Sequence, residues 1–503
     1  MLRSSLVLDP AFRVGPIPRR IYGALAEHMG RSIYTGIFEP DHPSADEHGF
    51  RGDVLDLVRE LGVTTVRYPG GNFVSGYRWE DGVGPVETRP RRLDLAWHSL
   101  ETNSFGLDEF MTWCRQTDVE PMLALNLGTR GVQEAVDLLE YANHPGGTAL
   151  SDLRRAHGVA EPYAVKLWCL GNEVDGPWQI GHKTAREYGQ LARATARAMR
   201  LVDPELELVV CGSSHARMPT FGSWEVEVLD EAYDDVDLMS CHAYFEERRG
   251  DLGSFLASSV VFDAQIEGVI ASVDHVRARR RGKKQINLSV DEWNVGYLSQ
   301  PHAKAPVGSW PVAPRISEDE YHVADAVVMG SLLITLLRHC DRVAAACLAQ
   351  LVNVIAPIRT EPAGPAWRQT IFYPFAQAAA YGRGDVLRVE VVGAEENTRE
   401  HGPVPVVDAV ATLDDAALGA TVFLVNRSML EDVEVSIDAR GLAPFFLESC
   451  LTLSAPNVRL SNTAADPLRI QPQPNARTAV DKGTVSVVLP PVSWTMLRLD
   501  LAG

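Results

Sequence analysis

The stretch "AVKLWCLGNEVDGPW", residues 164–178, is the key to the fold, because it joins a mostly apolar run directly to polar side chains. The run from Ala164 to Leu170 does not alternate apolar with polar residues, which is typical of a strand buried on both faces. Gly171 permits a sharp turn, after which Asn172 and Glu173 present an amide and a carboxylate. Taken alone, these two residues are equally compatible with an ordinary solvated strand end.

Seven further runs of this kind lie between about residues 17 and 375, separated by stretches with helical periodicity. The eight runs together span residues 20–28, 64–71, 120–128, 164–173, 206–214, 236–244, 286–294 and 342–353. Eight β-α units in about 360 residues predict a (β/α)8 TIM barrel with long loops. A doubly wound open sheet is the alternative, but it usually carries a glycine-rich phosphate turn after its first strand, and "ALAEHMGRS" at 24–32 is not one.

After about residue 383 the helical periodicity disappears. Short β-rich runs at 418–428, 433–441 and 484–501 recur between Gly, Pro and Asp turns, which predicts a jelly-roll-like antiparallel β-sandwich. The opening segment is also strand-like and is a candidate to pair with that sandwich. We therefore expect an N-terminal strand segment (1–16), a barrel domain (17–382) and a C-terminal sandwich domain (383–503).

Composition and charge exclude several classes of protein. The formal net charge of −19 argues against binding to a nucleic-acid backbone, and the one basic cluster, at 277–284, suits a solvated helix end. No stretch is apolar and long enough for a signal peptide or a membrane span. The seven cysteines show no CxxC or metal-ligand spacing. We expect a cytoplasmic protein that uses neither nucleic acid nor membrane as a partner.

Polar side chains follow almost every predicted barrel strand, at the end where such barrels carry out their chemistry. These residues are Glu27, His28, Arg67, Asn72, Asn126, Asn172, Glu173, His242, Tyr244, Glu292, Trp293, Gln350 and Asn353. Two carboxylates among them, Glu173 after the fourth strand and Glu292 after the seventh, are expected to face each other across the barrel mouth.

A facing carboxylate pair is what cleavage of a glycosidic bond requires. One group donates a proton to the departing oxygen, while the other stays ionised to meet a positively charged sugar. Other catalytic sets fit less well, because the sequence has no HExxH, no P-loop and no GxSxG elbow with its partners in order. His28 and His242 lack a third metal ligand at an obvious spacing. We therefore expect no metal and no cofactor.

The motif "GNE" at 171–173 together with "DEWN" at 291–294 resembles the clan of retaining (β/α)8 glycoside hydrolases. More particularly, the chain resembles the α-L-arabinofuranosidases of glycoside hydrolase family 51. The matching stretches run in the same order over nearly the whole chain and include "IYGALAEHMGRSIYTGIF" (21–38), "RYPGGNFVSGYRWEDGVGP" (67–85), "ETNSFGLDEF" (101–110), "VKLWCLGNEVDGPWQIGH" (165–182), "SCHAYF" (240–245) and "AQLVNVIAPI" (349–358).

This resemblance implies exo-acting release of terminal non-reducing α-L-arabinofuranosyl residues from arabino-oligosaccharides by double displacement. It also implies a hexamer and the absence of a metal. Residue by residue, it implies that Glu173 is the acid/base and Glu292 the nucleophile. The sugar-binding positions that it implies are Glu27, Asn72, Asn172, Tyr244 and Gln350, with Arg67, His242 and Trp178 in supporting roles.

Two positions depart from the family pattern. Asn72 stands where the family often has cysteine, and Gly296 follows "EWNV" where the family often has a tryptophan that shapes the pocket. We expect Tyr297, Trp310 or Trp178 to supply the missing aromatic surface.

The long Pro-rich stretches 38–49 and 299–315 are candidate lids or rims. The alternative functions are another retaining glycosidase of the same architecture, such as a β-xylosidase or an endo-glucanase, and a non-catalytic carbohydrate-binding barrel. A barrel without activity has no need of both Glu173 and Glu292, which argues against the last of these.

Overall fold

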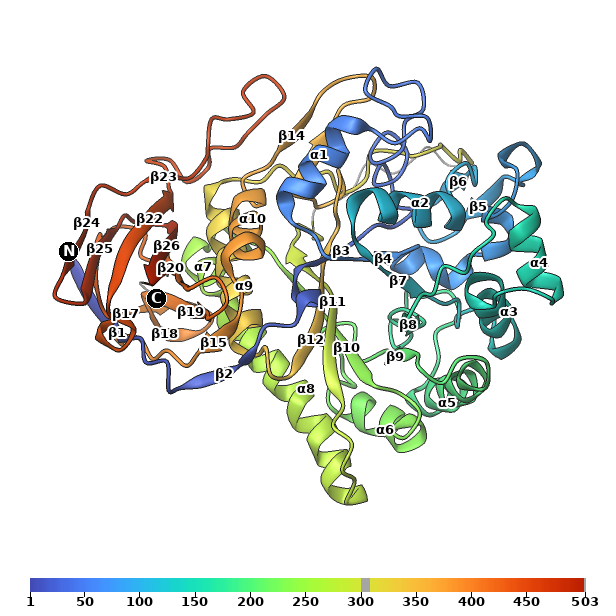
Figure 1. The fold of residues 1–503 in the computed structure, drawn as a ribbon, viewed down its shortest axis with the longest axis horizontal. Coiled ribbons are helices and arrows are strands. Elements are labelled where there is room, and N and C mark those ends of the chain that lie inside the picture. The colour runs from blue at the N-terminus through green and yellow to red at the C-terminus, as the bar shows by residue number, and fades with distance from the viewer. Residues whose placement is uncertain (300–307, 502–503) are drawn as a thin grey trace.

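A computed structural model describes residues 1–299 and 308–501, and its centre is a closed barrel of eight parallel strands (Figure 1). In order around the barrel the strands are β3 (Gly23–Leu25), β4 (Thr65–Tyr68), β7 (Glu120–Ala124), β8 (Leu167–Leu170), β9 (Glu207–Val210), β10 (Leu238–Phe245), β11 (Asn287–Val295) and β12 (Val343–Ala349). Pairing of β12 with β3 closes the ring, which confirms the predicted barrel and excludes the open sheet.

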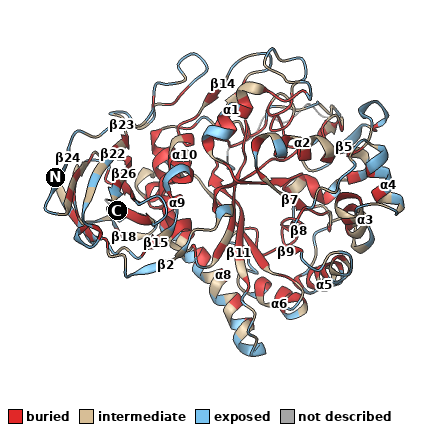
Figure 2. Ribbon diagram, in the orientation of Figure 1, coloured by how far each residue is buried: buried red, intermediate tan, exposed pale blue. Residues whose placement is uncertain are grey.

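Helices cover the outside of this barrel, as the periodicity predicts. They are α1 (Gly52–Leu61), α2 (Leu107–Thr117), α3 (Val132–Asn143), α4 (Ala149–Ala156), α5 (Ala185–Val202), α6 (Ser223–Ala232), α7 (Leu252–Leu256), α8 (Ser258–Arg280), α9 (Val323–Arg338) and α10 (Phe372–Tyr381). Figure 2 shows the strands of the barrel buried and the outer faces of helices such as α5 exposed. No helix in the described ranges is long and apolar enough to cross a membrane.

A two-sheet unit packs beside the barrel (Figure 1). One sheet has the order β16 (Val392–Gly393), β1 (Leu2–Val7), β21 (Val433–Asp438), β25 (Thr484–Leu489) and β24 (Thr478–Asp481). The other has the order β2 (Arg13–Pro16), β15 (Asp385–Leu387), β19 (Val407–Asp414), β20 (Gly419–Asn426), β26 (Ser493–Leu501), β22 (Phe445–Leu453) and β23 (Gln473–Pro474). Their inner faces share one apolar core.

The N-terminal strands belong to these two sheets rather than to the barrel. β1 pairs in parallel with β21, and β2 pairs with β15. Three small hairpins complete the strands: β5 (Arg92–Asp94) with β6 (Ser99–Glu101), β13 (Ile358–Thr360) with β14 (Ala366–Arg368), and β17 (Glu395–Thr398) with β18 (Gly402–Pro405). We propose the domain limits 1–16, 17–382 and 383–503 on the basis of these pairings.

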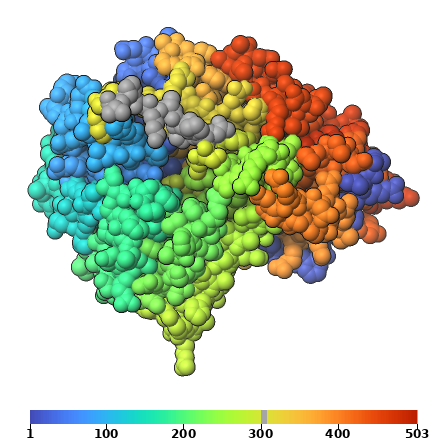
Figure 3. Space-filling view, turned by 180° about the vertical axis from the view of Figure 1, so that it is seen from behind, coloured from blue at the N-terminus to red at the C-terminus, as the bar shows by residue number. Residues whose placement is uncertain are grey.

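Helix α8 is the longest in the described part of the chain, and its C-terminal end projects from the body of the molecule (Figures 1 and 3). The basic cluster lies at this end. Several of its members form ion pairs with acidic residues that follow α6 or precede β10, as Arg280 does with Asp234 and Lys284 with Asp237. These pairs fit a solvated helix end.

Helix α9 joins the barrel to the sandwich. All of its residues from Val323 to Leu337 are buried, because it is covered by the barrel on one side and by β19, β20 and β26 on the other. Trp494 of β26 is central to this interface, where its ring stacks on Phe423 and its Nε1–H donates to Gln377 of α10. Gly330 of α9 leaves the space that the Trp494 ring fills.

We predict that Gly330→Ala destabilises the protein by about 1–3 kcal/mol through overpacking. A Cβ at this position would lie 2.2 Å from Cε3 of Trp494, so the helix or the ring has to shift. In an unconstrained helix the same change is stabilising. Denaturant unfolding of the variant measures the loss. Gly253→Ala in α7 is the matched control, because its Cβ would meet nothing closer than 3.8 Å; equal effects of the two changes would contradict the prediction.

Candidate active site

A pocket of about 500 Å³ opens at the C-terminal ends of the barrel strands. Its lining includes residues at the ends of six different strands, namely Glu27, Asn72, Glu173, Tyr244, Glu292 and Gln350. A parallel barrel brings these strand ends to one face, which is why residues more than three hundred positions apart in the sequence meet here. The structure thus brings these six predicted site residues together in one cavity, and Arg67, Asn172 and His242 form hydrogen bonds with members of this set.

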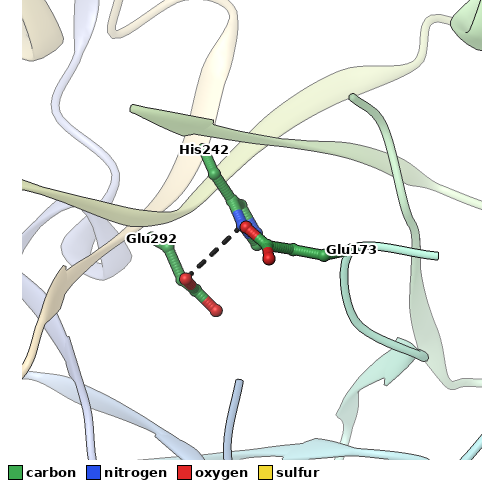
Figure 4. A group of neighbouring side chains, drawn as sticks. All are labelled: Glu173, His242 and Glu292. Carbon is green, nitrogen blue, oxygen red and sulfur yellow. Dashed lines mark hydrogen bonds and ion pairs between the residues drawn. The ribbon is translucent and has the colours of Figure 1, made fainter. Parts of the chain in front are cut away.

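Glu173, His242 and Glu292 form a tight group at the centre of the pocket (Figure 4). One ring nitrogen of His242 and one carboxylate oxygen from each glutamate all lie within 4.8 Å of one another. Glu173 follows β8 directly, and the turn that carries it begins at Gly171, whose φ of +102° is rarely adopted by residues with a side chain. The three side chains are buried.

Glu292 is held by donors on both carboxylate oxygens. Nη1 of Arg67 donates to Oε1 at 2.9 Å, and the Tyr244 hydroxyl donates to Oε2 at 2.7 Å. The second terminal nitrogen of Arg67 donates to Oδ1 of Asn172 at 2.8 Å. These charge-assisted contacts fix the orientation of Glu292.

Glu173 has a different environment. Burial raises the pKa of its carboxyl group, and the charge of Glu292 raises it further, against the opposing effect of His242 and Trp178. Trp178 Nε1–H donates to Oε2 at 2.9 Å, and His242 Nδ1 lies 2.9 Å from Oε1. Two carboxyl groups thus meet at one site in different surroundings, which is how such groups acquire different roles.

The amide side chains of Asn172 and Asn72 contact each other, and Asn72 lines the pocket. Nδ2 of Asn172 donates to Oδ1 of Asn72 at 3.2 Å, and Gln179 donates to the same oxygen. Arg67 orients Asn172 from the other side. The amide pair is thus pre-organised to offer hydrogen bonds at fixed positions in the pocket.

Glu27 and Gln350 make up a further part of the pocket wall. Glu27 accepts hydrogen bonds from the Phe73 backbone, from Trp97 Nε1 at 3.0 Å and from Gln350 Nε2 at 3.0 Å. Burial, followed by the charge of Glu292, raises the pKa of Glu27 to about 8 despite these donors.

Trp97 lines the same wall, although nothing in the strand pattern indicates it. It lies between β5 and β6, far along the chain from any barrel strand end. Met29 and Ser317 also line the pocket from loops. The ends of predicted strands do not indicate such residues.

The aromatic surface expected opposite Gly296 comes from Trp178 and Trp97. Tyr297 is not among the pocket-lining residues, because its hydroxyl donates to Asp325 of α9. Trp310 packs against His98 outside the pocket, so neither Tyr297 nor Trp310 replaces the missing tryptophan. Of the stretch 299–315, proposed as a lid, residues 300–307 lie outside the described residues.

The group of Glu173, His242 and Glu292 has the spacing of a metal site, which the sequence did not indicate. Its hydrogen bonds fit a metal poorly. Both ring nitrogens of His242 already face carboxylates, Glu173 and Asp291, and a guanidinium and a phenol hold Glu292. His28, the other candidate ligand, contacts Glu101 and Tyr68 instead.

Comparison with known proteins gives consistent results. The family model described as "Alpha-L-arabinofuranosidase 1 domain" matches residues 57–263, and that described as "Alpha-L-arabinofuranosidase C-terminal domain" matches residues 291–493. An intracellular exo-α-(1→5)-L-arabinofuranosidase of Streptomyces lividans is 56% identical over 99% of this chain and 75% of its own length. An exo-α-(1→6)-L-arabinofuranosidase of Bifidobacterium longum is 53% identical over 99% of this chain and 97% of its own.

Solved structures agree with the sequence comparisons. A family 51 α-L-arabinofuranosidase from Bifidobacterium longum superposes with a TM-score of 0.95 at 48% identity and covers 99% of both chains. An α-L-arabinofuranosidase from Thermotoga maritima, solved with arabinose, has a TM-score of 0.88 at 33% identity, with 99% of this chain and 100% of that chain covered.

The raised pKa of Glu27 predicts a pH-dependent loss of stability. The unfolded chain releases this proton near pH 4.5 and the folded protein near pH 8, so the free energy of unfolding falls as pH rises between these values. Glu27→Gln cannot ionise, so its stability relative to the wild type should rise through this window by up to about 1.4 kcal/mol per pH unit. Thermal unfolding of both proteins from pH 5 to pH 8 checks this; parallel pH dependence would show that the Glu27 proton is not involved.

Proposed function

Because the chain belongs to the α-L-arabinofuranosidases of glycoside hydrolase family 51, we propose that its carboxylate pair releases terminal non-reducing α-L-arabinofuranosyl residues from arabino-oligosaccharides by double displacement. One observation carries the mechanism. Oxygens of Glu173 and Glu292 approach within 4.8 Å. Carboxyl groups of retaining glycosidases lie about 5–5.5 Å apart, whereas inverting enzymes need about 6.5–9.5 Å to admit a water molecule.

In the first step Glu292 attacks the anomeric carbon and forms a glycosyl ester. The glycosidic C–O bond breaks at the same time, and Glu173 gives its proton to the leaving oxygen. Arg67 and Tyr244 hold Glu292 through both of its carboxylate oxygens. Burial is the main cause of the raised pKa of Glu173. The raised pKa favours a protonated carboxyl group, which can give the leaving group the proton that it needs.

In the second step Glu173, now ionised, takes a proton from water. The water oxygen bonds to the anomeric carbon and the ester to Glu292 breaks, which restores both carboxyl groups. Asn172 precedes Glu173 and shares the guanidinium of Arg67 with Glu292, and we assign it to the sugar 2-hydroxyl, a contact that strengthens as the ring flattens. Asn172 is oriented for this by Arg67.

The part of the pocket wall that Glu27 and Gln350 form suits a terminal sugar. Glu27, Gln350 and Trp97 form a hydrogen-bonded group with buried or partly buried polar atoms, and we assign it to the sugar hydroxyls together with Asn72 and Tyr244. A site built from so many fixed polar groups discriminates strongly between sugars, because a wrong hydroxyl pattern leaves them unpaired.

Initial rates on a panel of 4-nitrophenyl glycosides test the function directly. The α-L-arabinofuranoside should be cleaved far faster than the β-xyloside or β-glucoside. A preference for either of the others would support the alternative glycosidases, and binding without turnover would support a carbohydrate-binding barrel. Since the similar enzymes named above act on (1→5) and (1→6) linkages, arabino-oligosaccharides of each linkage form the second half of the panel.

We further propose a cytoplasmic location and a hexameric assembly, with no nucleic-acid or membrane partner. The location is supported by several similar enzymes whose names describe them as intracellular. The hexamer rests on the family resemblance alone, and light scattering of the purified protein decides it.

The first product should retain its anomeric configuration. Two successive displacements at the same carbon restore the starting configuration, while a single attack by water inverts it. Proton NMR of the sugar formed in the first minutes of reaction, before mutarotation, measures this. An inverted first product would exclude the ester intermediate on Glu292.

Single substitutions should separate the roles of the two glutamates. Glu292→Ala removes the nucleophile and should lower kcat by about 10³-fold or more on every substrate. Glu173→Ala should abolish cleavage of natural linkages, whose alkoxide leaving groups need a proton, but should spare the first step on aryl substrates.

Azide provides the control for these assignments. It needs no base, so it should restore turnover of Glu173→Ala and produce a glycosyl azide with retained configuration. If azide instead rescues Glu292→Ala with retention, or if Glu173→Ala slows aryl and natural substrates equally, the two roles are assigned to the wrong residues.

A further inference from the structure

A β-bulge in β11 turns two successive acidic side chains toward the barrel mouth. In the pairing of β10 with β11, Ser240 lies opposite Ser289 but His242 lies opposite Glu292, so β11 carries one extra residue between these pairs. Successive residues of a regular strand point to opposite faces, and a bulge re-aims one of them. As a result Asp291 and Glu292 both contact Arg67, at 3.6 Å and 2.9 Å.

Asp291 is therefore a third buried carboxylate beside the pair, and the double displacement has no use for it. Its side chain is 1% exposed. A buried charge is costly unless it is paired, so its partners indicate what it does. They are Arg67 and the Cys169 thiol on Oδ2 and His242 on Oδ1.

His242 connects Asp291 to Glu173. Its Nε2 lies 3.0 Å from Oδ1 of Asp291, and its Nδ1 lies 2.9 Å from Oε1 of Glu173. The ring is 3% exposed, so water does not compete for either nitrogen. A single imidazole thus spans the distance between the acid/base carboxyl and a carboxylate that the substrate does not reach.

Two proton arrangements satisfy this chain of contacts. In the first, Nε2–H donates to Asp291, and the Nδ1 lone pair accepts a hydrogen bond from the protonated carboxyl of Glu173. In the second, the ring is an imidazolium that donates to both carboxylates. The Nε2 proton stays in place in both, so one proton passes between Nδ1 of His242 and Oε1 of Glu173 without any other change.

The charges around His242 favour holding that proton. Three carboxyl groups face the ring, Glu173 from the end of β8 and Asp291 and Glu292 from β11. Among the described residues, Arg67 of β4 is the one permanent cation in contact with this group, and Tyr244 of β10 remains a neutral donor to Glu292.

The shifts in pKa agree with this count. Burial alone would lower the pKa of His242, but the charge of Glu292 and the contacts with Asp291 and Glu173 raise it well above its usual value. Burial would raise the pKa of Asp291, but Arg67 and His242 hold it below its usual value. Asp291 thus stays ionised while the pair beside it binds a proton.

We propose that Asp291 is a positioning residue that acts through His242 to keep a proton on the Glu173–His242 pair into the alkaline range. This inference rests on the proposed role of Glu173 as the acid/base. Removing the negative charge of Asp291 lowers the proton affinity of the pair. It also weakens the preference of the neutral ring for a proton on Nε2. The ring can then carry its proton on Nδ1 and donate it to Glu173, which stabilises the ionised carboxylate. Both effects have the same sign.

Asp291→Asn tests this through the pH profile of kcat/KM on an arabino-oligosaccharide. The alkaline limb should move to lower pH by about 1–2 units, as expected for the loss of a charge in contact with a titrating group. At a fixed pH on the alkaline side the activity should therefore fall by about 10–100-fold. On 4-nitrophenyl α-L-arabinofuranoside, whose leaving group needs little protonation, kcat/KM at the optimum should change by only a few-fold.

Two further variants show whether Asp291 acts through His242. Asp291→Glu keeps the charge and should keep the alkaline limb closer to that of the wild type than Asp291→Asn does. In a His242→Asn background, Asp291→Asn should cause no additional shift of the limb, because the connection is already broken. If Asp291→Asn does not fold, Asp291→Ser removes the same charge with a smaller side chain.

Glu225→Gln is the matched control for replacing a buried carboxylate by an amide. Glu225 is buried and accepts backbone N–H groups of Ser213 and Gly222, away from the pocket. It should leave the limb unchanged. An unmoved limb in Asp291→Asn, equal loss on both substrates, or a full shift in the His242→Asn background would overturn the proposal. Failure of the wild type to cleave any arabinofuranoside would instead refute the proposed function.

Discussion

The site depends on the contacts that the guanidinium group of Arg67 makes. Its side chain is 1% exposed and lies between Glu292, Asp291 and Asn172. A buried cation is stable only when anions or strong acceptors surround it, so its partners must keep their places. Because the partners come from β11 and from the end of β8, one side chain of β4 fixes three strand ends relative to one another.

The same cation gives Glu173 and Glu292 different surroundings. Glu292 receives a direct charge-assisted hydrogen bond from Arg67, whereas Glu173 meets an indole N–H and an imidazole. Burial raises the pKa of Glu173, and the negative charge of Glu292 raises it further. Two identical side chains thus meet different surroundings through position alone, which suits them to the separate roles proposed for them. The side chains of Asp291 and His242, which support these groups, are less exposed than that of Glu173.

The barrel and its covering helices were predictable because burial leaves a local pattern. Continuous apolar runs such as 206–214 and amphipathic segments such as α1 record which residues face the core, and the alternation of the two kinds indicates a parallel barrel. Polar residues such as Glu173 that interrupt those runs mark the strand ends. The sequence therefore predicted both the fold class and the cluster of residues at the mouth.

What the sequence by itself determined is thus the set of strand ends, and with them the wall of Glu27, Asn72, Glu173, Tyr244, Glu292 and Gln350. Only the tertiary structure decided which further residues join these six at the site. Trp97 reaches the pocket from a hairpin, and Tyr297 turns away from it toward Asp325. Asp291 enters the site because a register shift against β10 breaks the alternation of β11. A bulge and a loop path depend on contacts between segments that are distant in the chain, and no local pattern of apolar and polar residues records them.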